Sequence, residues 1–180
     1  MLKAAEVIHA KGFDAATVNE ISEATGLTKG GLYHYIRSKR DLLYRIMDFA
    51  MDILFSEVVD KARGIADPEE QLRTVIQRHV ELTVEDEGLL TALSEEVGAL
   101  TPRHARRILR RKREYFDFVR GILLRLRRRG KLAKVNPTVA TFSIFGMILF
   151  CPRWYRSNGA LSPRQVAEEI ARLALNGIRK

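Results

Sequence analysis

The stretch from Thr17 to Leu42, TVNEISEATGLTKGGLYHYIRSKRDL, decides the fold expected for this chain. Thr17 with Glu20 three residues later is a capping-box pattern that predicts the start of a helix. Gly26 is typical of the residue that ends such a helix, and Thr28 can cap the next one. Two short helices joined by a glycine turn predict a helix-turn-helix, the arrangement that places one helix in the DNA major groove.

The second short helix, expected over residues 29–36, has one apolar and one polar face. Its two aliphatic residues, Leu32 and Ile36, lie one turn apart and should face the core. The opposite face carries glycines, which let a helix approach base edges, and polar groups that suit bases or phosphates. The alternative is that Tyr33 and Tyr35 fill the small core. The residues of the polar face and its flanks are Lys29, Gly30, Gly31, Tyr33, His34 and Tyr35.

A third helix is expected to begin at Ser38, because Ser38 and Asp41 repeat the capping-box pattern. Its apolar periodicity predicts one long helix that runs to about Arg63, before Gly64. Free backbone N–H groups at the start of this helix are donors for phosphate, with Lys39 beside them.

The motif LTKGGLYHYIRSKRDLL resembles the signature of the TetR family (AcrR-like) of bacterial transcriptional regulators, which is close to S/T-K-G-x-L-Y-x-H-F-x-S-K-x-x-L. The upstream AAEVIHAKGFDAATVNEIS is similar to the family's first helix and the start of its second. The sequence departs from the family at Tyr35, where His is commoner. Met1 also falls inside the expected first helix, so the given sequence has no stretch that matches the family's basic N-terminal arm; either the native start lies further upstream or this regulator does without the arm. The DNA contacts that the resemblance implies are Thr17, Asn19, Thr28, Lys29, Gly30, Gly31, Tyr33, His34, Tyr35 and Lys39.

The remaining sequence predicts helices and no strand, so the expected fold class is all-α. We expect a three-helix DNA-binding domain over residues 1–45 and a helical bundle for effector binding and dimerisation over residues 46–180. Four pairs of a cap residue with proline predict helix starts, and three glycines predict helix ends. The starts are Asp67-Pro68, Thr101-Pro102, Asn136-Pro137 and Ser162-Pro163, and the ends are Gly64, Gly88 and Gly130.

The last two predicted helices carry more apolar surface than a small bundle needs. The helix over 137–156 is apolar nearly all round, although Cys151-Pro152 is expected to kink it, and the helix over 163–178 has a seam of Ala and Gly. The resemblance implies that these two helices form a four-helix interface between two copies. Such a homodimer would bind a palindromic operator. The alternative is a core formed within one chain.

Charge is distributed unevenly along the 180 residues, whose net charge is +9. Residues 51–100 carry four Lys or Arg against twelve Asp or Glu, whereas residues 101–134 carry fourteen against two. The basic block at 103–131 therefore has three interpretations. It is either a solvated face whose charges pair with those of the acidic segment, or an anion site for a ligand, or an additional contact with DNA phosphates.

The segment ALSEEVGALTPRHARRILRRKREYFDFVRGIL resembles effector domains of TetR-type regulators of fatty-acid, acyl-CoA or steroid-ring catabolism. This resemblance implies a coenzyme A thioester as effector, with an apolar tunnel for the acyl chain and arginines for the phosphates. The alternative effector is an uncharged aromatic or drug-like molecule, and His79 is alternatively a core histidine bonded to a neighbour. The candidate effector residues are His79, Tyr115, Arg120, Phe145, Arg153 and Trp154.

The sequence carries no catalytic signature. The four histidines lack the spacing of a metal site, and GLTKGG lacks the spacing and the preceding strand of a phosphate loop. We therefore expect no enzyme, cofactor, metal site or catalytic residue. The expected partners are double-stranded DNA, a small effector and a second copy of the chain. The alternative is a helical ligand-binding protein of the same fold that has lost DNA binding.

The expected location is the cytoplasm. The opening MLKAAEV lacks the pattern of a signal peptide, and Cys151 is the only cysteine, so no intrachain disulfide forms. The longest apolar run, over residues 139–151, is too short to span a bilayer, and no membrane association is expected.

Overall fold

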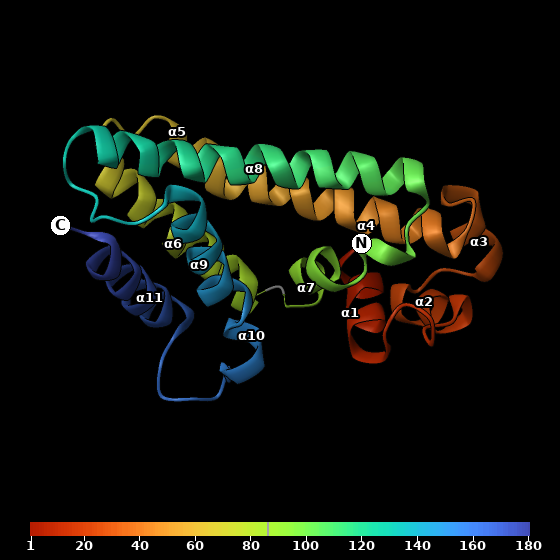
Figure 1. Ribbon diagram of the computed structural model, residues 1–180. Coiled ribbons are helices and arrows are strands. Elements are labelled where there is room, and N and C mark those ends of the chain that lie inside the picture. The colour runs from red at the N-terminus through yellow and green to blue at the C-terminus, as the bar shows by residue number, and fades with distance from the viewer. Residues whose placement is uncertain (86) are drawn as a thin grey trace. The chain divides into compact units, whose positions relative to one another are not determined.

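The computed structural model describes residues 1–85 and 87–180 (Figure 1). Within these residues every regular element is a helix, which confirms the all-α prediction. An isolated antiparallel bridge joins Leu132 to Arg179. In the part of the chain that the structure describes, no helix is both long and apolar enough to cross a membrane.

The chain folds into two compact units. Unit 1 comprises Met1–Asp52 and Asp86–Arg111, and unit 2 comprises Ile53–Glu85 and Lys112–Lys180. The helices α4 (Lys39–Leu54) and α8 (Pro102–Arg128) each contribute residues to both units. The predicted domain boundary between residues 45 and 46 stays a prediction.

Unit 1 contains the helix-turn-helix. Its apolar centre includes the fully buried Ile8, Ile21, Leu43 and Ile46, and α1 packs against both α2 and α7. The last residues of α4 in this unit approach the first half of α8 through side-chain hydrogen bonds described below. The helices of unit 1 besides α4 and α8 are α1 (Leu2–Lys11), α2 (Val18–Thr25), α3 (Lys29–Tyr35), α7 (Glu87–Glu95) and the 3₁₀ turn η2 (Val97–Ala99).

The caps of α2 and α3 agree with the sequence predictions. The Thr17 hydroxyl accepts the N–H of Glu20 and the Glu20 carboxylate accepts the N–H of Thr17, which completes the capping box. Gly26 ends α2 in the left-handed conformation with φ of 69°, which a side chain would disfavour. The Thr28 hydroxyl accepts the N–H of Gly31 and caps α3.

The second predicted capping box, at Ser38 and Asp41, forms one of its two hydrogen bonds and lacks the other. The Ser38 hydroxyl accepts the N–H of Asp41 at 3.1 Å, as expected. The Asp41 carboxylate instead accepts the N–H of Arg37 at 3.0 Å and binds the Arg45 guanidinium. The carboxylate therefore satisfies a backbone donor one residue earlier than the capping box requires.

The helix predicted from Ser38 to about Arg63 changes its type along its length. After α4 the backbone forms a π-helix, η1 (Phe55–Asp60), and then the short α5 (Lys61–Arg63) before Gly64. π-Helical segments are rare and are frequent at functional sites. Nothing in the apolar periodicity of the sequence indicated this change.

Unit 2 is a bundle in which α6 (Pro68–Glu85) contacts both α9 (Pro137–Leu149) and α11 (Pro163–Ile178) (Figure 1). Each of these helices has a proline in its first turn, as predicted, and its preceding residue, Asp67, Asn136 or Ser162, accepts a backbone N–H through its side chain.

The expected interruption at Cys151-Pro152 is confirmed, whereas the helix end expected at Gly88 is wrong. The helix expected over 137–156 is divided at Phe150 into α9 and α10 (Cys151–Trp154), because Pro152 has no N–H to continue the helical ladder. Gly88 was expected to end the preceding helix, but it lies inside a helix, in the first turn of α7 (Glu87–Glu95).

Candidate nucleic-acid interface and ligand site

The exposed face of α3 carries the residues that the sequence assigned to DNA. Leu32 and Ile36 are buried and anchor the helix, so the opposite side is turned to solvent. Tyr33 and Tyr35 have 45% and 65% of their surfaces exposed, so neither ring fills the small core. His34 packs edge-on against Tyr35, with ring centroids 5.4 Å apart. Lys29 is exposed at the first turn, where its charge is available to a phosphate or a base.

The two glycines of α3 have different roles. A β-carbon at Gly30 would have no neighbouring atom within 4 Å, so Gly30 leaves the surface of the helix low and open. A β-carbon at Gly31 would lie 3.1 Å from the Thr28 hydroxyl oxygen, which caps the same helix. Gly30 therefore keeps a side chain off the outer face, whereas Gly31 makes room for the cap.

The start of α2 is fixed by an ion pair in addition to its cap. The Lys11 ammonium lies 2.6 Å from the Glu20 carboxylate, and this hydrogen bond, with those from Thr17, lowers the pKa of Glu20 to about 2. Thr17 and Asn19 are exposed at this end of α2. The Thr17 hydroxyl oxygen accepts the capping hydrogen bond, whereas the amide of Asn19 lies at the surface.

Lys39 differs from the other candidate DNA contacts in that its ammonium is already engaged. Its Nζ donates to the carbonyl oxygens of Phe13, Asp14 and Ala16 at 2.7, 3.1 and 3.0 Å. The same ammonium lies 4.5 Å from the centroid of the Phe13 ring. The backbone N–H of Phe13 donates to the Glu96 carboxylate at 3.1 Å. These bonds hold the turn between α1 and α2, so Lys39 positions the helix-turn-helix whether or not it also approaches a phosphate.

Three of the six candidate effector residues meet in the interior of unit 2. The Nδ1 atom of His79 on α6 lies 3.0 Å from the hydroxyl oxygen of Tyr115 on α8. The Phe145 ring of α9 stacks on the Tyr115 ring at 5.2 Å and meets the His79 ring edge-on at 6.0 Å. Burial lowers the pKa of His79 to about 3 and raises the pKa of Tyr115 well above its usual value, so both groups are neutral at physiological pH.

The other three candidates lie outside this hydrogen-bonded group. The Arg120 guanidinium binds the Asp117 carboxylate at 3.1 Å and lies 5.8 Å from the centroid of the Phe116 ring. The ring centroids of Phe116 and Phe145 are 6.3 Å apart. Arg120 therefore borders the aromatic cluster that His79, Tyr115, Phe116 and Phe145 form. Arg153 and Trp154 lie on α10, where both side chains are exposed.

Two family models match almost the whole chain. Residues 2–46 match the model described as bacterial regulatory proteins of the tetR family. Residues 66–178, more than half of the chain, match the C-terminal domain described as tetracyclin repressor-like. The chain belongs to the tetR family of bacterial regulatory proteins. This confirms the family that the sequence motif indicated.

Relatives of this TetR-family chain are transcriptional regulators that match over nearly their full lengths. The HTH-type transcriptional repressor KstR2 of Mycobacterium tuberculosis is 24% identical over 179 residues, which cover 98% of this chain and 90% of that protein. The structure of AibR in complex with isovaleryl coenzyme A and operator DNA is 31% identical, with a TM-score of 0.87 over 95% of this chain and 93% of that one. PfmR from Thermus thermophilus is 27% identical, with a TM-score of 0.87 over 97% and 96%.

Much of the basic block of this TetR-family chain is paired within its own unit. In unit 1, Arg111 binds both Asp48 and Asp52 of α4 at 2.6 Å. In unit 2, the Arg125 guanidinium donates to the Gln71 amide oxygen, and Arg129 binds Asp67 at 3.1 Å. For these residues, the contacts support the interpretation that the block pairs with acidic and polar groups of neighbouring helices.

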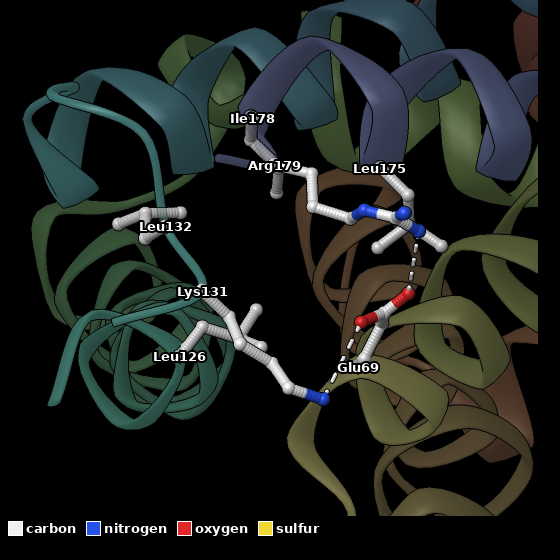
Figure 2. A pocket seen from close by; sticks show the side chains of 7 residues that line it. All are labelled: Glu69, Leu126, Lys131, Leu132, Leu175, Ile178 and Arg179. Carbon is white, nitrogen blue, oxygen red and sulfur yellow. Dashed lines mark ion pairs between the residues drawn. The ribbon is translucent and has the colours of Figure 1, made fainter. Parts of the chain in front are cut away.

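Figure 2 shows another part of this pairing, around the chain end. The Glu69 carboxylate lies between the Lys131 ammonium, at 3.8 Å, and the Arg179 guanidinium, at 3.6 Å. The hollow beside them has a volume of about 10 Å³, which is room for about one water molecule. This hollow therefore belongs to the attachment of the C-terminus and cannot admit an effector. Its lining residues are Glu69, Leu126, Lys131, Leu132, Leu175, Ile178 and Arg179.

A second hollow, of about 300 Å³, opens between α6 and α11. It is polar, with two arginines and two glutamates among its residues, and so does not suit an apolar acyl chain. Its lining residues are Thr74, Gln77, Arg78, Glu81, Arg164 and Glu168.

Sequence reasoning missed several members of the aromatic cluster. Phe55, the first residue of the π-helix, lies 6.4 Å from Tyr115, and Phe116 packs on Phe142 at 4.7 Å. The sequence did contain a signal for a shared aromatic face: Tyr115 and Phe116 are adjacent, and Phe142 and Phe145 lie one helical turn apart. Phe55 had no such signal, because its approach depends on the π-helix.

Proposed function

We propose that the chain is a homodimeric repressor that binds a palindromic operator through α3 and leaves it when an acyl-CoA thioester binds in unit 2. The observation that carries the DNA-binding part is the outer face of α3, where the open surface at Gly30 stands opposite the buried anchors Leu32 and Ile36 and exposed Lys29 lies at the N-terminus of the helix. A low helix face with a cation at its N-terminus suits entry into the major groove. Its action needs no catalysis, and because bacterial operators lie in the cytoplasm, we expect it to act there.

The similarity to AibR supports the effector class, since that protein is described with isovaleryl coenzyme A and operator DNA over nearly the same length. The neutral, aromatic interior around His79 and Tyr115 suits the apolar acyl part of such a ligand. The exposed Arg153 and the half-buried Arg120 are candidates for the phosphates of the coenzyme A head. Repression ends when the effector favours the state that does not bind DNA, with a coupling of about 1–3 kcal/mol.

An exposed apolar stripe on α9 supports the homodimer. Val139, Phe142 and Met147 on α9 and Phe150 directly after it are exposed and recur at helical spacing, and Leu173 is exposed on α11. A patch of this kind on a regulatory protein marks an interface. Two copies paired through it about a two-fold axis would present two α3 helices to the two half-sites of a palindrome.

The DNA-binding part is tested with an operator selected from random palindromic DNA. We predict that Lys29→Ala weakens operator binding about tenfold, reduces the salt dependence of binding by about one phosphate contact, and leaves dimerisation unchanged. Lys61→Ala is the matched control, because it removes the same charge from an exposed position on α5. Unchanged operator affinity in Lys29→Ala would mean that α3 does not enter the groove.

The effector part is tested by thermal unfolding with free coenzyme A, butyryl-, isovaleryl-, octanoyl- and palmitoyl-CoA, and the corresponding free acids. A ligand at 100 times its dissociation constant adds about 2.7 kcal/mol to stability, which is a clear shift. We expect an acyl-CoA to stabilise the protein and to release the operator in a fluorescence-anisotropy titration. Failure of every acyl-CoA to do either would reject this effector class.

A further inference from the structure

The pair formed by His79 and Tyr115 is polar, buried and surrounded by aromatic rings. Only 4% of the surface of each residue is exposed, and the Phe145 and Phe55 rings approach Tyr115 at 5.2 and 6.4 Å. A purely apolar pair would fill such a space without the cost of desolvating an imidazole and a phenol.

The pair has two donor hydrogens but only one hydrogen bond between its members. A neutral imidazole carries one N–H and the phenol carries one O–H, but the contact between His79 Nδ1 and the Tyr115 oxygen uses only one of them. Among the described residues, neither side chain makes a second hydrogen bond; Thr83 binds the backbone carbonyl of His79, not its ring. In either tautomer, one donor of the pair has no acceptor among the described residues. The His79 Nε2 atom is not fully buried, so it remains within reach of water or a ligand.

The chemistry of the two groups decides where this donor lies. Phenol is the more acidic donor and imidazole nitrogen the more basic acceptor, so Tyr115 donates to Nδ1 and the remaining hydrogen is on Nε2 of His79. Burial keeps the imidazole neutral, with a pKa of about 3. The donor is thus an uncharged N–H in aromatic surroundings.

The π-helix is an independent sign that this place has a role beyond packing. It begins at Phe55, whose ring faces Tyr115, and it interrupts an otherwise regular helix. Such segments are rare and are frequently found at functional sites. Phe55 and Phe145 are only half-buried, so the aromatic cluster reaches the surface of unit 2.

We propose that Nε2 of His79 donates a hydrogen bond to the carbonyl oxygen of the acyl thioester, while the Phe55, Tyr115 and Phe145 rings enclose the carbons on either side of it. The inference rests on the proposed acyl-CoA effector and names the group of that effector which is recognised. A thioester oxygen is a neutral acceptor and matches a neutral donor. A free carboxylate would enter unpaired by any cation, and its desolvation would exceed what one neutral hydrogen bond returns. The site therefore selects the thioester over the free acid.

The test compares an acyl-CoA with its thioether, in which the carbonyl is replaced by a methylene. Using isovaleryl-CoA and S-(3-methylbutyl)-CoA, or the matching pair for whichever acyl-CoA binds best, affinities are measured by calorimetry for the wild type, His79→Phe and His79→Gln. We expect the wild type to prefer the thioester about 10- to 100-fold. His79→Phe should abolish the preference, and His79→Gln, which places an amide N–H near the same point, should restore part of it. The ratio of the two affinities cancels losses of packing that both ligands share.

A second measurement needs no variant and so does not depend on the folding of His79→Phe. With a ¹³C label on the thioester carbonyl, the infrared stretch of the bound ligand should lie below its position in a solvent that cannot donate hydrogen bonds. A band at the hydrocarbon position would overturn the inference. Equal affinities of the wild type for thioester and thioether would also overturn it, while leaving the acyl-CoA effector intact. If neither ligand binds, the effector class itself is rejected and the inference falls with it.

Discussion

Burial of His79 makes the stability of the protein depend on pH. Its pKa is about 3 in the folded chain and 6.5 in an ordinary environment, so between these values the unfolded chain binds more protons than the folded one. The free energy of unfolding should therefore fall by an amount on the order of 2 kcal/mol from pH 8 to pH 5. Tyr115, its partner, stays neutral throughout because burial raises the pKa of the phenol.

Urea unfolding of the wild type and of His79→Phe at pH 8 and pH 5 measures this contribution. The variant should lose that part of the pH dependence, because it has no imidazole to protonate in the unfolded chain. An equal fall in stability for both proteins would mean that other groups cause it and that His79 is accessible to protons when folded.

Gly30 allows the stability and the DNA affinity of α3 to be separated. Because no atom lies within 4 Å of its missing β-carbon, Gly30→Ala should fit the free protein and stabilise α3 by up to about 1 kcal/mol through backbone entropy. The same methyl would stand on the face proposed to meet the bases, and so should weaken operator binding about tenfold.

The control for this substitution is Gly64→Ala, where a β-carbon also meets nothing and φ is −78°. It should change stability without changing operator affinity. Thermal unfolding and fluorescence anisotropy on the same samples give both quantities. Tighter operator binding by Gly30→Ala would show that the outer face of α3 does not approach the bases.

Lys39 shows where residue-level prediction from sequence ends. Its place beside a helix N-terminus predicted a phosphate contact, and that remains a prediction. Its three hydrogen bonds to the carbonyls of Phe13, Asp14 and Ala16 could not be predicted, because backbone carbonyls 23 to 26 residues away carry no side-chain signature. By contrast, the inward side of α3 followed from Leu32 and Ile36 alone, because helical spacing fixes which residues share a face.

At the level of secondary-structure elements, the first residues of helices could be predicted better than irregularities within helices. The caps at Thr17, Thr28 and Ser162 depend on residues within one turn, and the structure has each of them. The π-helix at 55–60 and the position of Gly88 inside a helix had no signal of this kind in the residues around them. The meeting of His79, Tyr115 and Phe145 is of the second kind, since it joins three helices whose pairing no local pattern specified.

The pairing of α4 with the first half of α8 depends on Arg111. Its guanidinium, with 18% of the side chain exposed, binds the carboxylates of Asp48 and Asp52 at 2.6 Å and the backbone oxygen of Asp48 at 2.9 Å. Arg111→Met keeps the length of the side chain but leaves two carboxylates and a carbonyl short of a donor. We predict a loss of about 1–3 kcal/mol in the free energy of unfolding.

Arg103→Met is the control for this prediction, because Arg103 lies exposed in the first turn of the same helix. It should change stability by no more than about 0.5 kcal/mol. Chemical denaturation of both variants in low and high salt gives the comparison. Equal stability of the two variants would mean that solvent already screens the α4–α8 ion pairs.

At the scale of the whole molecule, DNA affinity should depend on self-association. Val139 on α9 and Leu173 on α11 are 59% and 62% exposed in the single chain, so a charge at either position should leave the fold of the monomer intact. In the proposed dimer, two-fold symmetry introduces each substitution twice. If each charge costs about 1.5 kcal/mol in an apolar interface, the dimer weakens by about 100-fold or more.

Val139→Glu and Leu173→Glu are therefore expected to be monomeric by analytical ultracentrifugation at concentrations where the wild type is dimeric. Leu109→Glu is the matched control, because Leu109 is 51% exposed on α8 and outside the proposed interface. The monomeric variants should bind a full palindrome no more tightly than a single half-site, since the advantage of two linked α3 helices is lost. If Val139→Glu and Leu173→Glu stayed dimeric with full affinity for the palindrome, the two copies would have to meet through another surface, and the stripe on α9 would need another partner.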